Sequence, residues 1–158
     1  MEFWENSGPN QTQTEMGKFD LINFNNRKIT GDYQVQVGLK YAEGDMGGGL
    51  VFNAPSNKTK QGAYMVSYTG KGGYMQWGYY DNSGVFQFQG GTPMANSGAD
   101  GKVHTLAVQV KGTSYQVILD GTALGQPAPL LNVTAVGYTG LLTSTSRVLF
   151  ENFKLENI

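Results

Sequence analysis

The chain has 158 residues, of which 39% are hydrophobic and 12% aromatic, enough to build one domain with its own core. Only 15% are charged, against about 25% in ordinary globular proteins, and 11 basic with 12 acidic residues leave a net charge of -1. This balance offers no positive field for a nucleic acid, and no apolar run of about 18 residues could insert into a membrane. We therefore expect a single domain over residues 1–158, with residues 1–14 as a peripheral arm.

Alternation of apolar and polar residues predicts β-strands throughout the chain. The clearest segment is Tyr33–Tyr41, whose apolar residues share one face while Gln34 and Gln36 point to the other. In chain order, the predicted strands are Lys18–Phe24, Tyr33–Tyr41, Gly49–Asn53, Ala63–Thr69, Tyr74–Tyr80, Val85–Gln89, Val103–Val110, Tyr115–Asp120, Gly137–Thr143 and Arg147–Leu155. Segments 90–98 and 124–131 are expected to be loops. This spacing of short strands predicts an all-β fold, a two-sheet antiparallel sandwich.

Several segments occur in a characteristic order along the chain. They are Gly47-Gly48-Gly49-Leu50-Val51-Phe52, Tyr64–Tyr68, His104–Val108 with Lys111-Gly112, Tyr115–Gly121, Gly137–Leu141 and Val148–Leu155. This order resembles the concanavalin A-like lectin/glucanase superfamily over nearly the whole chain. The resemblance implies a jelly roll of two curved sheets, one of them concave, as in laminin-G-like domains, legume lectins, many carbohydrate-binding modules and some glucanases. Fold analogy alone does not fix the function.

Catalysis by the glucanase route needs closely spaced carboxylates on one strand face. On a strand this means Asp or Glu at intervals of about two residues, and the sequence has no such pair. Glu151 is the one carboxylate inside a strong strand, and most others fall at turns. His104 is the only histidine, and we expect it to be half-buried with a backbone partner. The chain is therefore predicted not to be an enzyme.

Metal and cofactor sites receive little support from the residue types. One histidine without cysteine makes a transition-metal site unexpected. A structural calcium ion remains open, because calcium accepts backbone carbonyls with one or two carboxylates. The candidate ligands, which form no recognisable loop motif, are Asp20, Asp32, Asp45 and Asp81. No other cofactor is expected.

The segment Ala63–Gln89 carries the binding prediction, because its turns set a register. If the turn from Asp81 to Gly84 closes a hairpin, Tyr80 faces Val85 and Trp77 faces Phe88. The apolar face, expected to lie in the core, is then Trp77, Tyr79, Phe86 and Phe88. The simplest preceding turn places Tyr68 opposite Tyr74. The second face then comprises Tyr64, Tyr68, Tyr74, Gln76, Tyr80, Gln87 and Gln89.

This second face combines aromatic rings with amide groups and almost no charge. Neutral sugars fit such chemistry, because their C–H faces pack on rings while their hydroxyls need uncharged hydrogen-bond partners. Asn53, Asn82 and Asp81 are candidate rim contacts. Alternatively, tyrosine and glutamine are ordinary solvent-facing strand residues, or the loop 90–98 covers them.

The leading hypothesis is a non-catalytic module that binds a neutral glycan on the concave sheet. The alternative is a structural or assembly domain of a surface layer, adhesin, filament or virion, in which the same sheet contacts a protein partner or another copy. Either function implies an extracellular or surface-exposed location. Residues 1–15 lack the basic and apolar segments of a secretion signal, so the signal is not expected within this chain.

Overall fold

The computed structural model describes residues 11–13, 19–70, 73–131 and 136–158, and their regular structure consists of β-strands. No helix long and apolar enough to span a membrane occurs in this part of the chain. The all-β prediction is therefore confirmed.

One sheet has six antiparallel strands in the order β1-β13-β4-β9-β10-β11. Their bounds are β1 Gln11–Gln13, β4 Tyr33–Glu43, β9 His104–Lys111, β10 Ser114–Leu119, β11 Thr122–Pro129 and β13 Arg147–Asn157. The longest pairing joins β13 to β4, and β4 in turn pairs with β9. The sheet is built from segments far apart in the sequence, as expected for a jelly roll.

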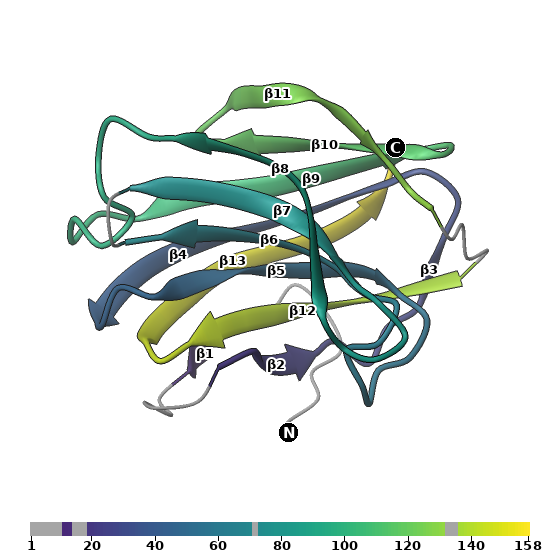
Figure 1. Cartoon of the computed structure of the whole chain (residues 1–158), viewed down its shortest axis with the longest axis horizontal. Coiled ribbons are helices and arrows are strands. Elements are labelled where there is room, and N and C mark those ends of the chain that lie inside the picture. Colours follow the sequence, from purple (N-terminus) through teal and green to yellow (C-terminus); the bar gives the residue numbers. More distant parts are fainter. Residues whose placement is uncertain (1–10, 14–18, 71–72, 132–135) are drawn as a thin grey trace.

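The second sheet has seven strands, with β2-β12-β5-β6-β7-β8 in order and β3 paired to β12. Their bounds are β2 Leu21–Phe24, β3 Ile29–Thr30, β5 Gly47–Ala54, β6 Tyr64–Thr69, β7 Tyr74–Tyr80, β8 Phe86–Pro93 and β12 Val136–Ser144. In Figure 1, strands β5 to β8 of this sheet lie across strands β4, β9 and β13 of the other sheet. The predicted two-sheet sandwich is confirmed.

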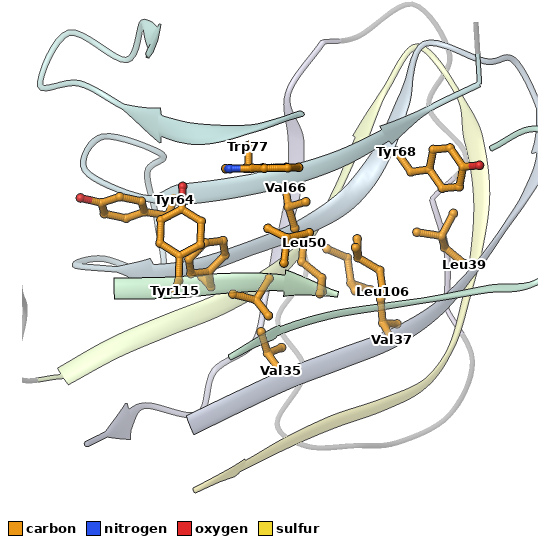
Figure 2. Close-up of a cluster of buried hydrophobic side chains, with 14 of the residues drawn as sticks. Val35, Val37, Leu39, Leu50, Tyr64, Val66, Tyr68, Trp77, Leu106 and Tyr115 are labelled. Atoms are coloured by element: carbon orange, nitrogen blue, oxygen red, sulfur yellow. The ribbon is translucent and has the colours of Figure 1, made fainter. Parts of the chain in front are cut away.

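The main core lies between the two sheets (Figure 2). Val35, Val37 and Leu39 of β4 are fully buried, as the alternation in Tyr33–Tyr41 predicts. From the seven-stranded sheet, Leu50 and Trp77 pack against the same cluster. We call the side of each sheet that faces this cluster its inner face and the opposite side its outer face.

A second apolar cluster covers part of the outer face of the seven-stranded sheet. Val51 belongs to it, although Val51 lies between Leu50 and Phe52, which both belong to the main core. Successive strand residues point to opposite faces, so Val51 faces outward. The other buried members are Ile22, Phe24, Ala54, Ala63, Met65, Tyr80 and Leu142.

The edges of the sheets differ from the sequence-based prediction. The expected loop 124–131 is largely occupied by β11, despite Pro127 and Pro129. Strand β11 is an edge strand, where proline is tolerated because one side of the strand needs no hydrogen-bond donor. Strand β8 likewise continues into the expected loop 90–98. At the opposite edge, residues 11–13 of the expected arm form β1, and the rest of residues 1–14 lies outside the described residues.

Candidate functional site

The turn between β7 and β8 is longer than the sequence predicts. The Asp81 N–H donates to the Val85 carbonyl at 2.9 Å, and Asp81 Oδ1 accepts hydrogen bonds from the N–H groups of Ser83 and Val85. Tyr80 therefore lies opposite Phe86 and not Val85. A one-residue shift exchanges the two faces of a strand. Phe88, predicted to be in the core, is accordingly 59% exposed.

Tyr64 and Tyr68 lie in the main core, so their predicted place on a binding face is wrong (Figure 2). Tyr68 is opposite Met75 and not Tyr74, which turns both tyrosines of β6 inward. The Tyr64 hydroxyl accepts a hydrogen bond from the Leu131 N–H, and the Tyr68 hydroxyl donates to the Asn96 carbonyl. These rings stabilise the sandwich and are not available to a ligand.

Tyr80 lies on the outer face but is buried in the second cluster. Its hydroxyl donates to Asp20 Oδ1 at 3.0 Å, and Lys60 forms an ion pair with the same carboxylate at 3.2 Å. Burial, followed by the negative charge of Asp20, raises the pKa of Tyr80 above its ordinary value. Tyr80 is thus also unavailable to a ligand, contrary to the prediction.

The amides of Gln87 and Gln89 are both used within the protein. Gln87 donates to Asp81 Oδ2 at 3.0 Å. Gln89 donates to the Pro129 carbonyl at 2.8 Å and accepts a hydrogen bond from the Tyr115 hydroxyl. Because Tyr115 and Pro129 belong to the six-stranded sheet, Gln89 connects the two sheets. The face predicted for these glutamines is therefore also wrong.

Tyr74 and Gln76 remain half-buried on the outer face of β7, as predicted. Gln76 lies opposite Ser67 on β6 and Gly91 on β8. The Tyr74 ring lies against Gly91, since a Cβ atom on that glycine would be 2.6 Å from the Tyr74 hydroxyl oxygen. Two of the seven predicted ligand-binding residues thus stay together at the surface.

A cleft of about 320 Å³ opens between the edge strands β8 and β11. Its lining consists of Trp77, Gln89, Gly90, Gly91 and the β11 segment 125–129. None of these side chains carries a charge. The cleft therefore presents the Gln126 amide, Pro127, Pro129 and backbone to solvent, and Trp77 borders it as a largely buried ring.

Glycines pack against the indole of Trp77 where it borders this cleft. A Cβ atom on Gly90 would overlap the indole nitrogen, and one on Gly125 would be 3.3 Å from Cζ2. A bulge after Phe88 aligns Gly90 with Trp77. Trp77 is 4% exposed, and among the described residues its indole N–H donates no hydrogen bond. Sequence analysis missed the cleft because Gly90, Gly91 and the segment 125–129, which form much of its lining, were predicted to lie in loops.

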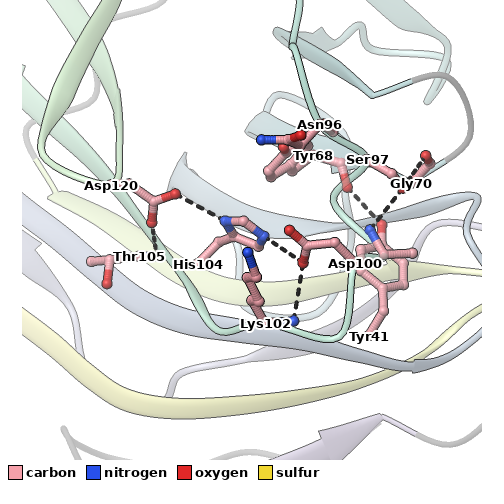
Figure 3. A network of polar contacts seen from close by, with 11 residues as sticks. Tyr41, Tyr68, Gly70, Asn96, Ser97, Asp100, Lys102, His104, Thr105 and Asp120 are labelled. Atoms are coloured by element: carbon pink, nitrogen blue, oxygen red, sulfur yellow. Dashed lines mark hydrogen bonds and ion pairs between the residues drawn. The ribbon is translucent and has the colours of Figure 1, made fainter.

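His104 is buried and forms a polar network with Asp100 and Asp120, and its predicted backbone partner is wrong (Figure 3). Its Nε2 lies 2.9 Å from Asp100 Oδ1 and its Nδ1 2.9 Å from Asp120 Oδ2. Burial lowers the pKa of His104, but the hydrogen bonds and charges of Asp120 and Asp100 outweigh burial and raise it. The ring also packs edge-on against Tyr68. These contacts connect the 96–103 loop to the core.

The remaining candidate residues do not assemble into a site. No group of three Asp, Glu, His or Cys side chains suited to a metal ion occurs among the described residues. Asp20 binds Lys60, and Asp32 accepts a hydrogen bond from the Gly112 N–H. Asn53, predicted at a rim, is 4% exposed. Asn82 is exposed in the β7–β8 turn.

No family model matches the chain, and no curated protein matches its sequence. The structure resembles the carbohydrate-binding module CBM66 from Bacillus subtilis, with a TM-score of 0.74 and 17% identity over 89% of this chain and 84% of that chain. It also resembles the exoplasmic/lumenal domain of VIP36, solved with Ca²⁺ and Man3GlcNAc bound, with a TM-score of 0.60, 12% identity and coverages of 94% and 84%.

A third similar structure is the GH43 protein BlXynB from Bacillus licheniformis, with a TM-score of 0.55 and 10% identity over 80% of this chain and 28% of that chain. At such identities the similarity is one of fold. The jelly roll implied by the sequence resemblance is confirmed. The fold is shared by binding modules and by a protein of a glycoside hydrolase family, so the function must be argued from the site.

Proposed function

We propose that this protein is a non-catalytic glycan-binding module, and that the cleft between β8 and β11 holds a neutral sugar. The observation that carries the proposal is the uncharged lining of the cleft, which includes Trp77. Because Trp77 is only 4% exposed, a sugar would contact the small exposed part of the indole and direct its hydroxyls to the indole N–H, to Gln126 and to the backbone. Pockets of a few hundred Å³ are typical of small-ligand sites.

The proposed position differs from that of the sequence-based hypothesis. The predicted sheet face retains only Tyr74 and Gln76, because three predicted tyrosines are buried and two predicted glutamines are bonded internally. The similarity to CBM66 and to the glycan-bound VIP36 domain supports glycan binding as the general function. The preference for a neutral glycan rests on the composition of the cleft.

The absence of catalysis is part of the proposal. Glycoside hydrolysis needs two carboxylates flanking the scissile bond, whereas the described lining of the cleft contains none. We also propose that binding requires no cofactor. Calcium is tested directly by comparing affinity with and without a chelator.

The assembly hypothesis receives less support. Addition of a strand from another copy requires an edge strand with free N–H groups. Strand β11 carries Pro127 and Pro129. Prolines at an edge hinder such pairing. An extracellular or surface-exposed location remains part of the glycan-binding proposal.

The test begins with an array of neutral and acidic glycans, followed by calorimetric titration of the tightest binder. Replacing Gln126 by alanine should weaken binding by about 0.5 to 1.5 kcal/mol through a lost hydrogen bond. Trp77→Phe should also weaken it while keeping an aromatic ring in the core. Gln61→Ala, an exposed glutamine in the β5–β6 loop, is the matched control. Raising the salt concentration should leave the affinity nearly unchanged.

Absence of binding to every neutral glycan on the array would overturn the proposal. So would parent-like affinity in both Gln126→Ala and Trp77→Phe. If the affinity falls strongly as the salt concentration rises, the ligand is an acidic sugar and not a neutral one.

A further inference from the structure

We propose that the glycan site does not end in the cleft but continues over Gly90 and Gly91 to Tyr74 and Gln76 on the outer face. The ligand would then be an oligosaccharide, or the end of a polysaccharide, that bends around the sheet edge. This inference rests on the proposed glycan-binding function and specifies the length and path of the ligand.

Strand β8 passes between two aromatic rings at Gly90 and Gly91. Trp77 and Tyr74 are three residues apart on β7, so their side chains lie on opposite faces of the sheet. The Trp77 indole lies against Gly90 on the inner side, and the Tyr74 ring lies against Gly91 on the outer side. Packing an aromatic ring over a glycine of a neighbouring strand stabilises such a position.

Gly91 belongs to both surfaces. It lines the cleft, and it is also in contact with Tyr74. Because Gly90 and Gly91 have no side chains, only the backbone of β8 separates the cleft from the outer face. A chain of sugars that passes around the free edge of β8 at these glycines would therefore meet the backbone, with the Trp77 ring on one face of the strand and the Tyr74 ring on the other.

The crossing point can bind hydroxyls directly. Strand β8 is the last strand of the order β2-β12-β5-β6-β7-β8, so among the described strands its other edge is unpaired. Backbone N–H and C=O groups on such an edge are available as hydrogen-bond partners. Beyond them, the half-buried Gln76 lies opposite Gly91 and adds an amide on the outer face.

The path is longer than one sugar ring. At a rise of about 3.3 Å per residue, Trp77 and Tyr74 are about 10 Å apart along β7, and the strand thickness adds to this. A monosaccharide in the cleft cannot reach Gln76. The outer residues should therefore contribute only to longer ligands.

The experiment measures affinity for a size series, from one to six residues, of the tightest-binding neutral glycan on the array. The parent should bind more tightly as the glycan lengthens from one residue to about four. Gln76→Ala should leave monosaccharide affinity unchanged and weaken the tetrasaccharide about 3- to 10-fold. Trp77→Phe should weaken every member of the series. Gln36→Ala is the matched control, because Gln36 is a half-buried glutamine on the outer face of the other sheet.

Failure of this inference is distinguishable from failure of the proposed function. If affinity does not rise beyond the monosaccharide, or if Gln76→Ala binds the tetrasaccharide as the parent does, the path over β8 is wrong. Sensitivity of the monosaccharide to Trp77→Phe would then still support the cleft. If no member of the series binds, both proposals are overturned. Tyr74→Phe provides a second measurement, since it keeps the ring over Gly91 and removes only the hydroxyl.

Discussion

His104 Nδ1 and Asp120 Oδ2 form a hydrogen bond of 2.9 Å. His104 is the first residue of β9, and Asp120 directly follows β10. Asp100 contacts the other ring nitrogen at the same distance. Asp120 Oδ1 also accepts a hydrogen bond from the Thr105 N–H. The histidine is thus held between two carboxylates, with Tyr68 packed edge-on against its ring. These contacts stabilise the folded state, and the size of this stabilisation depends on the charge of the imidazole.

The first prediction concerns pH. The carboxylates raise the pKa of His104 above its ordinary value, so the protonated ring stabilises the folded state. This contribution is complete below the unfolded pKa of about 6.5 and is lost as pH rises through the folded pKa. In urea unfolding, the parent should exceed His104→Gln in stability by about 0.5 to 1 kcal/mol more at pH 5.5 than at pH 8.5. An equal or larger difference at pH 8.5 would contradict the assignment.

The second prediction separates two tyrosines that the sequence placed on one face. Tyr64 is 1% exposed in the core, so Tyr64→Ala should lower the free energy of unfolding by about 3 to 5 kcal/mol, as for other large buried aromatics. Tyr74 is half-buried on the outer face, and Tyr74→Ala should cost about 1 kcal/mol or less. Chemical denaturation measures both. Similar losses in the two variants would show that the register of β6 and β7 is wrong.

The third prediction concerns Gln89, which connects the two sheets. Removing its side chain leaves the Pro129 carbonyl and the Tyr115 hydroxyl without their partner. Gln89→Ala should therefore destabilise the fold by about 1 to 3 kcal/mol. Gln87→Ala is the control and should cost less, because the Gln87 side chain donates its hydrogen bond to Asp81 in the β7–β8 turn and not to the other sheet. The reverse order of stability would exclude this role for Gln89.

The fourth prediction concerns the turn that sets the register. Asp81→Ala removes the acceptor of the Ser83 and Val85 N–H groups, so hydrogen exchange at these two amides should accelerate relative to the core strands. Hydrogen bonds from the Val85 N–H lower the pKa of Asp81. The effect is therefore expected above the ordinary pKa of aspartate and should fade as pH falls through the folded pKa. Unchanged exchange at neutral pH would show that Asp81 does not hold the turn.

The fifth prediction is the absence of hydrolysis. Purified protein should release no reducing sugar from any glycan that it binds, because the lining of the cleft, among the described residues, contains no carboxylate. Glu151→Gln, Asp81→Asn and His104→Ala should all behave as the parent does. Steady release of sugar that one of these changes abolishes would place the protein among the enzymes.

The sequence by itself determined the fold class and most of the strands. In Tyr33–Tyr41 the apolar alternation identifies the buried face, since a strand that packs against one core must place its apolar residues at every second position. The same argument correctly placed Trp77 in the core. Such information is local, because it depends only on the spacing within one strand.

Only the tertiary structure decided the register and the cleft. The predicted binding face depended on the length of the β7–β8 turn. In the structure, Asp81 accepts two backbone hydrogen bonds in this turn, and the turn is one residue longer than predicted. Composition does not distinguish that turn from the shorter one, and a shift of one residue exchanges the faces. The cleft brings Gly90 near Gly125, on edge strands of different sheets. Whether a glycine there packs against an indole or only breaks a strand depends on which residue lies beside it, and that is fixed by the packing of the two sheets.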